Sequence, residues 1–353
     1  MAFTGGSSSD LDVNDLDDDV DEVVDVAPSR SRLPGLGQRL RFLRWSAMGL
    51  LVVGFVWSAQ RSGVPFDRER LAMWILPTLA IGCIGRSWGD ARRLLIDWTP
   101  FLGFFLAYDF SRGAANDLGL PVHVTAQIDV EKALFFGNVP TVWFQQQLYD
   151  RGTVHWWEVI VAFTYVTHFF VPLVVAAILW AKRRPLYRMF ITRLLTVSFL
   201  GVAVFCIAPT APPWMAAEQG HIEPVSRIAQ NGWSKVGLHF ARSLIDKGQG
   251  TINTVAAIPS LHAAYAMILA AFLWPMIERR WLRPLLLIHP TMMVFTIVYG
   301  GEHYVVDALA GLVCVWAAFR FWAWFEARRG WDTGGRPTTY RPVPKVPGLS
   351  WGR

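Results

Sequence analysis

Charged residues are scarce in this sequence. Asp, Glu, Lys and Arg make up 17% of its 353 residues, whereas a soluble domain carries about 25%. The acidic residues crowd the first 25 positions and the basic residues crowd a few short segments, which leaves long stretches almost without charge. This pattern excludes an ordinary soluble domain.

Cysteine is nearly absent as well, and the sequence shows no signal peptide. Cys83, Cys206 and Cys314 form an odd set in apolar surroundings, which excludes a disulfide framework and a cysteine-based metal site. The first 28 residues lack the basic start and short apolar core of a signal peptide. Their Gly, Ser and Asp content predicts a disordered tail.

Long apolar runs dominate what is present. A helix needs roughly 20 residues to cross a bilayer, and the 18 Trp and 23 Phe suit a membrane protein. We therefore predict an all-α fold, a polytopic transmembrane helical bundle of about eight spans. The predicted spans are residues 43–60, 69–86, 93–110, 157–180, 190–208, 259–276, 284–300 and 303–326.

The basic residues between the spans predict the orientation. Basic clusters precede the first span and follow the second, fourth, sixth and eighth. Because cytoplasmic loops are enriched in Lys and Arg, we expect both termini in the cytoplasm of a multi-pass cell-membrane protein. Two long outer loops then cover residues 111–156 and 209–257. The predicted domains are an acidic, then basic disordered tail at 1–40, a transmembrane catalytic domain at 41–326 and a cytoplasmic tail at 327–353.

The net charge of +6 lies mainly beside the apolar runs, where topology and anionic lipids explain it better than nucleic acid does. Membrane lipids are therefore the expected partners, and the sequence does not indicate an oligomeric state. In the second outer loop, Ser226 to Lys247 predicts an amphipathic helix that carries Arg227, Lys235 and Arg242.

Two histidines and one aspartate stand out by position. His262 begins the sixth predicted span and His303 begins the eighth, so both are expected at the same depth on the outer side. Asp307 follows His303 by four residues, which places both on one helix face. A carboxylate there can fix the imidazole tautomer and leave the other nitrogen as a nucleophile or base.

Other interpretations of this cluster stay open. A His–Asp pair can simply tie helices together, although ionisable residues inside membrane spans are usually functional. Two histidines and one carboxylate can also form a metal site with open positions. A non-catalytic membrane scaffold or transporter is a further alternative.

The sequence around these residues resembles the type 2 phosphatidic acid phosphatase (PAP2) superfamily. Pro259-Ser260-Leu261-His262 is similar to its second motif, and His303-Tyr304-Val305-Val306-Asp307 is similar to its third. The resemblance implies that His303 attacks phosphorus to form a phosphohistidine, that Asp307 orients His303 and that His262 protonates the leaving alkoxide. It implies no metal or other cofactor.

The sequence departs from the wider family in the groups that balance the phosphate charge. Ile297 stands six residues before His303, where that family has an Arg, and the Lys182–Pro185 run is predicted on the cytoplasmic side. The remaining outer-side candidates are Arg112, Arg227, Lys235 and Arg242.

In these departures the sequence resembles one branch of the superfamily, the inositol phosphorylceramide synthases and their bacterial relatives. Ala211-Pro212-Pro213-Trp214 is similar to an Ala-Pro-Pro-Trp element of that branch, and the segment from Tyr165 to Pro172 is similar to its His-Phe-x-x-Pro element. Glu302 stands where the fungal enzymes often have a second His.

We therefore predict a membrane lipid phosphotransferase that moves a phospho-headgroup, phosphoinositol, through a phosphohistidine, with its active site at the extracytoplasmic face. The alternative is a lipid or polyprenyl phosphate phosphatase that uses the same three residues. Asp109 is a headgroup candidate because an inositol or sugar needs hydroxyl acceptors, and an Asp109–Arg112 pair is the structural alternative. The predicted substrate-binding residues are Ser260, Tyr165, His168, Asp109, Arg112, Trp214 and Arg242.

Overall fold

The structure is a computed structural model that describes residues 35–63, 68–117, 120–238 and 253–329. Within these ranges the chain is helical and forms no strand. Both predicted tails lie outside them, except for residues 35–40 and 327–329. The long helices are α1 (Leu36–Ser62), α2 (Arg68–Cys83), α3 (Trp88–Asp117), α6 (Trp156–Lys182), α7 (Arg184–Ile207), α11 (Leu261–Leu273), α12 (Ile288–Tyr299) and α13 (Val305–Arg329).

Each predicted span falls on one of these helices, which confirms the all-α fold. Five helical segments are long and apolar enough to cross a membrane, namely α1, α6, α7, α13 and the segment Arg280–Tyr299 that contains α12. The apolar parts of α2 and α11 are shorter, and α3 carries more polar residues. The chain is therefore a membrane protein, whereas the count of eight spans and the side of each terminus stay predictions.

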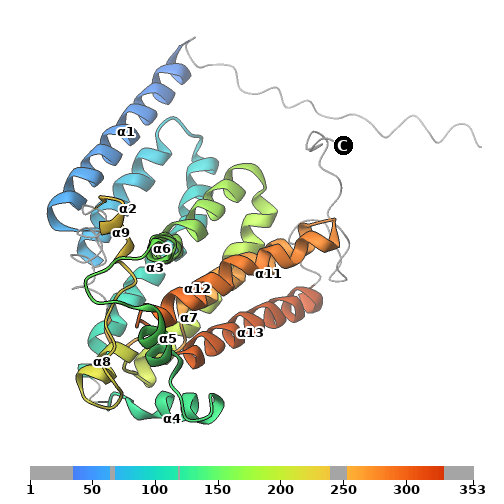
Figure 1. Ribbon diagram of the computed structural model, residues 1–353. Coiled ribbons are helices and arrows are strands. Elements are labelled where there is room, and N and C mark those ends of the chain that lie inside the picture. The colour runs from blue at the N-terminus through green and yellow to red at the C-terminus, as the bar shows by residue number, and fades with distance from the viewer. Residues whose placement is uncertain (1–34, 64–67, 118–119, 239–252, 330–353) are drawn as a thin grey trace, which may run out of the picture.

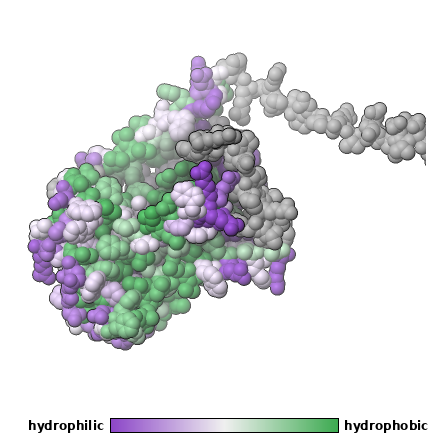
Figure 2. Space-filling model, turned by 45° about the vertical axis from the view of Figure 1, so that its right-hand side comes forward, coloured by the Kyte–Doolittle hydropathy of each residue, from purple (hydrophilic) through white to green (hydrophobic). Residues whose placement is uncertain are grey.

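The surface agrees with a bilayer environment. Phe42, Leu50 and Trp316 are 66–76% exposed, although each would be hidden from water in a soluble protein. Figure 2 shows hydrophobic residues over most of one face, with hydrophilic residues gathered towards its margins. Lipid chains cover such a surface.

The two long segments that were predicted as outer loops contain short helices. The first holds α4 (Thr125–Leu134) and α5 (Pro140–Leu148), and the second holds α8 (Pro213–Glu218) and α9 (Gly232–Lys235). In Figure 1, α4 and α8 lie at one end of the long helices. α4 packs on α13, α5 on α12 and α9 on α6, so these segments form a cap on that end of the bundle.

The amphipathic helix predicted for Ser226–Lys247 is wrong where the structure describes it. Residues 226–231 are not helical, α9 is a single turn, and residues 239–252, with Arg242, lie outside the described ranges. The reason is long-range hydrogen bonding. Ser226 N and O bond to the Gln145 amide, and Ile228 N donates to Gly300 O at 3.1 Å. Backbone groups used in this way cannot pair along a helix.

The core lies between α7, α11 and α13, which pack against one another. It contains Phe190, Ile268 and Phe272, each no more than 1% exposed. A buried bidentate ion pair joins Arg193 on α7 to Glu326 on α13. Because removing one partner would leave an unpaired buried charge, this pair fixes how the two helices meet.

The Lys182–Pro185 run lies far from the predicted catalytic residues. Arg184 begins α7 and donates to Asp97 on α3, which also accepts from the indole of Trp180. The Thr210 segment near His303 follows the other end of α7. About 24 helical residues separate the two ends, roughly 35 Å, so the basic run lies away from His303, and its Arg184 joins α7 to α3.

Candidate functional site

The backbone around His303 is set by a glycine turn. Gly300 and Gly301 end α12, and Gly301 has a φ of 78°, in the left-handed region that favours glycine. The amides of Glu302 and His303 both donate to the carbonyl of Ile297. Ile297 itself is fully buried, so the position that carries an Arg in the wider family belongs to the core here.

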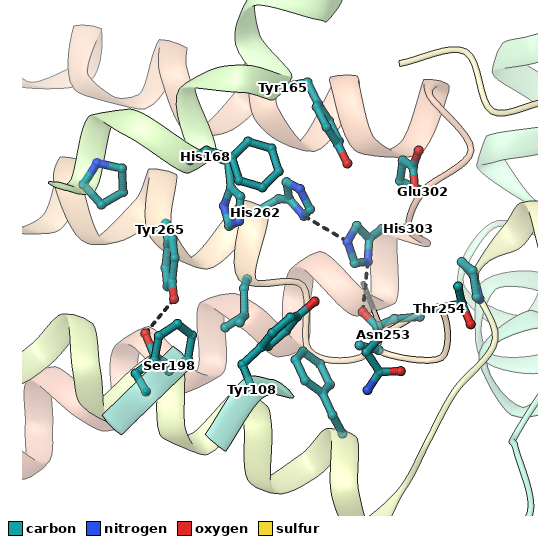
Figure 3. Close-up of a pocket in the computed structure, with 18 of the residues that line it drawn as sticks. Tyr108, Tyr165, His168, Ser198, Asn253, Thr254, His262, Tyr265, Glu302 and His303 are labelled. Carbon is teal, nitrogen blue, oxygen red and sulfur yellow. Dashed lines mark hydrogen bonds between the residues drawn. The ribbon is translucent and has the colours of Figure 1, made fainter. Parts of the chain in front are cut away.

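The hydrogen bonds of His303 define its tautomer. Its Nδ1 lies 2.9 Å from the carbonyl oxygen of Ala257. Because a carbonyl only accepts, Nδ1 carries the proton. The lone pair is then on Nε2, which lies 3.2 Å from Nδ1 of His262, as the dashed lines in Figure 3 show.

Asp307 lies beside His303, as the four-residue spacing predicts, but does not hydrogen-bond to its imidazole. Its Oδ2 lies 3.6 Å from Nδ1 of His303, which is too long for a hydrogen bond. The same oxygen accepts from the backbone amide of Tyr304 at 2.9 Å. The Ala257 carbonyl therefore fixes the tautomer, and Asp307 caps α13 and supplies a fully buried negative charge beside the imidazole.

The Ala257 carbonyl is positioned by the start of its own segment, residues 209–257. Thr210 N donates to Val255 O at 2.8 Å, and Ile258 N donates to the Thr210 hydroxyl at 3.0 Å. Thr210 directly precedes the Ala211–Trp214 element. This element therefore helps to position the backbone acceptor of His303.

His262 begins α11, whose N-cap is Ser260. The Ser260 hydroxyl accepts from Ala263 N, and its backbone amide donates to the Asp307 carbonyl at 2.9 Å. Ser260 is fully buried and lies outside the cavity lining. Its contacts position His262, and the predicted contact of Ser260 with substrate stays a prediction.

We expect Gly311→Ala to separate the two histidines. A Cβ at Gly311 would lie 2.5 Å from the Ser260 carbonyl, so α11 must move away from α13. Overpacking of this kind costs about 1–3 kcal/mol, and a shift near 1 Å at the reacting groups lowers the rate about 100-fold. Thermal unfolding and turnover of the purified variant measure both effects. Gly103→Ala is the control, because its Cβ meets nothing within 4 Å; full activity of Gly311→Ala would contradict this role.

Aromatic residues of α6 cover His262. The Tyr165 ring stacks on it at 4.9 Å between centroids, and the His168 ring lies 4.0 Å away. His168 also stacks on Tyr265, whose hydroxyl lies 2.6 Å from Ser198 Oγ. Within the part of the chain that the structure describes, Nε2 of His262 and Nδ1 of His168 are buried and have no hydrogen-bond partner.

These groups line a cavity of about 200 Å³. Polar side chains gather at the end near His303, where Figure 3 shows Asn253, Thr254 and Glu302. The wall between α3, α6 and α7 is apolar and includes Phe101, Phe104, Leu173, Leu194, Leu195 and Phe205. One polar end and one apolar arm suit an amphiphilic molecule.

Arg227 brings a cation to the polar end. Its guanidinium donates to both oxygens of Glu302 at 3.2 and 2.9 Å and lies over the Trp214 ring at 4.9 Å. The Gln145 amide fixes this loop, because it bonds to both Ser226 backbone groups and to Tyr299 O. Among the described residues that line the cavity, Arg227 and Glu302 are the two with a formal charge apart from the histidines.

Glu131 is a second carboxyl behind the site. It is fully buried on α4, and its Oε1 accepts from Val306 N at 2.9 Å at the start of α13. Burial is the main cause that raises the pKa of Glu131 to about 7, and the nearby Asp307 carboxylate acts in the same direction, against the opposing hydrogen bond from Val306 N. No sequence pattern indicated this contact, which joins residues 175 positions apart.

The raised pKa of Glu131 predicts that the free energy of unfolding falls as the pH rises. Below its unfolded pKa near 4.5 both states are protonated, so the group costs nothing. Above about 7 the folded protein must bury a charge, at a cost on the order of 3 kcal/mol. Thermal unfolding between pH 5 and 8 should therefore show a decline that Glu131→Gln reduces. Asp129→Asn, an exposed change on the same helix, should leave the decline unchanged; equal slopes for Glu131→Gln and the wild type would contradict the assignment.

The structure thus brings together most of the predicted site residues. His262, His303, Tyr165, His168 and Trp214 line the cavity, and Asp307 lies directly behind His303. The side chains of Asp109 and Arg112 lie outside what the structure describes, as does Arg242. Sequence reasoning missed Asn253, Ser198 and Tyr265 as cavity residues, since no motif marks them.

Comparison with known proteins agrees with this geometry. The family profile described as PAP2 superfamily matches residues 128–321. A phosphoinositol dihydroceramide synthase from Bacteroides thetaiotaomicron is 31% identical over 246 residues, which cover 67% of this chain and 77% of the relative. No solved structure matches the chain.

Proposed function

The chain belongs to the PAP2 superfamily and is an enzyme of its phosphotransferase or phosphatase type, and from this premise we propose that it transfers phosphoinositol between lipids. The donor is a phosphoinositol lipid and the acceptor is a lipid alcohol. The name of the relative, phosphoinositol dihydroceramide synthase, supports this choice.

One observation supports the proposed mechanism: Nε2 of His303 lies 3.2 Å from Nδ1 of His262. In the first step, the Nε2 lone pair attacks phosphorus and the bond from phosphorus to the donor lipid oxygen breaks. His262 enters this step as an imidazolium with both ring nitrogens protonated, and the leaving alkoxide takes the proton from its Nδ1, which leaves a neutral imidazole. The phosphoinositol group is then attached to His303 Nε2, and His262 is left as a base.

The second step reverses these roles. The hydroxyl of the acceptor lipid attacks phosphorus and gives its proton to His262 Nδ1, while the bond from phosphorus to His303 breaks. The imidazole of His303 is positively charged while it carries phosphorus. The buried Asp307 carboxylate at 3.6 Å stabilises that charge.

Arg227 is the proposed phosphate-binding cation. It lines the same cavity as His303 and approaches from the loop that Gln145 fixes. It replaces the Arg that the wider family carries at the position of Ile297. The apolar arm between α3, α6 and α7 accommodates the lipid chains.

A transfer assay tests the proposal. The purified full-length protein in liposomes is given phosphatidylinositol with a labelled inositol and a ceramide-type lipid with a free hydroxyl. We expect labelled inositol in a new lipid. If label is released only as water-soluble inositol phosphate, or if only phosphatidic acid is dephosphorylated, the enzyme is a hydrolase and the transferase assignment is wrong.

A further inference from the structure

The Glu302–Arg227 pair places opposite charges side by side at the reacting end of the cavity. Glu302 directly precedes His303 and is 9% exposed, and both of its oxygens accept from the Arg227 guanidinium. The Trp214 ring lies under that guanidinium, so Arg227 has little freedom to turn away. The cation at this end is therefore already balanced by one carboxylate.

We propose that Glu302, through its pair with Arg227, selects phosphodiester lipids with a hydroxylated headgroup and rejects phosphate monoesters. The inference rests on the proposed function, because it concerns the donor of the same site. It assigns a specificity role to a residue that replaces the second His of the fungal enzymes.

The charge count supports the selection against monoesters. A phosphate monoester carries about −1.5 to −2 at pH 7, because its second pKa is near 6, whereas a phosphodiester carries a single charge. Glu302 adds one negative charge beside the phosphate position, and Asp307 lies directly behind His303. A second charge on the substrate would meet these carboxylates without a further described cation in the lining.

The hydrogen-bonding capacity of Glu302 and Arg227 supports the selection of a polyol headgroup. Ionised carboxylates only accept hydrogen bonds, and guanidinium groups only donate them. A polyol phosphodiester can use both partners, since its phosphate oxygens accept from Arg227 and its hydroxyls donate to Glu302.

Binding of three lipids tests the proposal without turnover. Phosphatidylinositol, phosphatidylmethanol and phosphatidic acid are compared in nanodiscs by competition with a labelled lipid, all in a His303→Asn background. Phosphatidylmethanol is the reference, because it carries one charge and no headgroup hydroxyl. Relative to the binding of phosphatidylmethanol, Glu302→Gln should weaken the binding of phosphatidylinositol about tenfold and strengthen the binding of phosphatidic acid about tenfold.

Two variants serve as controls. Glu302→Asp keeps the charge and should keep the wild-type order of the three lipids. Glu218→Gln removes an exposed carboxylate on α8 and should change none of the affinities. If Glu302→Gln shifts all three lipids by the same factor, the residue only holds Arg227 and the specificity role is wrong.

Failure of the specificity role of Glu302 can be distinguished from failure of the proposed function. Selectivity is measured by binding, and transfer is measured with the wild-type protein in liposomes. Transfer without a selectivity change in Glu302→Gln would overturn the role of Glu302 alone. A selectivity change in a protein that only hydrolyses would keep that role and overturn the transferase.

Discussion

Replacing His303 by Asn should lower the transfer rate by at least about 10⁴-fold and abolish the phosphoenzyme. The loss is expected because Nε2 of His303 carries the lone pair that faces the cavity, while Nδ1 is occupied by the Ala257 carbonyl. Asn is the informative substitution, since its amide nitrogen can take the place of Nδ1 and keep the bond to Ala257. The fold is thereby kept while the nucleophile is removed.

The measurement is a rapid quench with donor labelled at phosphorus, followed by detection of acid-labile, base-stable label on the protein. Wild-type protein should carry label at His303, and the variant should carry none. His221→Asn makes the same change at an exposed position away from the cavity and should behave as the wild type. Label that persists in His303→Asn would place the nucleophile elsewhere.

The pairing of distant residues limited what the sequence could predict about this site. His303 and Asp307 lie four residues apart, so helical spacing and the family resemblance were enough to propose them together. The true partner of His303 Nδ1 is a backbone carbonyl 46 positions away. Every residue has a carbonyl, so its use as an acceptor leaves no mark in the sequence.

The proposed phosphate-binding cation illustrates the same limit. Arg227 was one of four outer-side candidates, and its partner Glu302 lies 75 positions away. What brings them together is the amide of Gln145, which bonds to the backbone of Ser226 and Tyr299. The same bonds prevent the helix that the sequence predicted over Ser226–Lys247, because they use the backbone groups of that segment.

The positions of the long helices were easier to predict from the sequence than the roles of individual helices in the site. Long apolar runs marked all eight long helices, since hydrophobicity along the chain is a local property. The short helices α4 and α5 carry weaker patterns and were predicted as loop, yet Glu131 on α4 reaches the start of α13. Their position depends on tertiary contacts that local patterns do not encode.

Replacing His262 by Asn should also lower the rate strongly, and the size of this loss should depend on the leaving group. His262→Asn keeps an amide N–H near the position of Nδ1 but cannot transfer a proton. With the lipid donor, whose alkoxide leaves poorly, kcat/KM should fall about 10²–10⁴-fold, the usual contribution of a general acid. With an aryl phosphodiester, whose phenolate leaves without protonation, the first step should fall less than about tenfold.

The comparison of the two donors separates chemistry from packing. His262 stacks on Tyr165 and His168, so a purely structural role would slow both donors by the same factor. A general acid slows only the donor that needs its proton. His303→Asn should be inactive on both donors, because the nucleophile is required whatever group leaves. Equal losses in His262→Asn would assign that residue to positioning, whereas selective loss with the lipid donor places the proton on Nδ1, which faces His303 in the resting site.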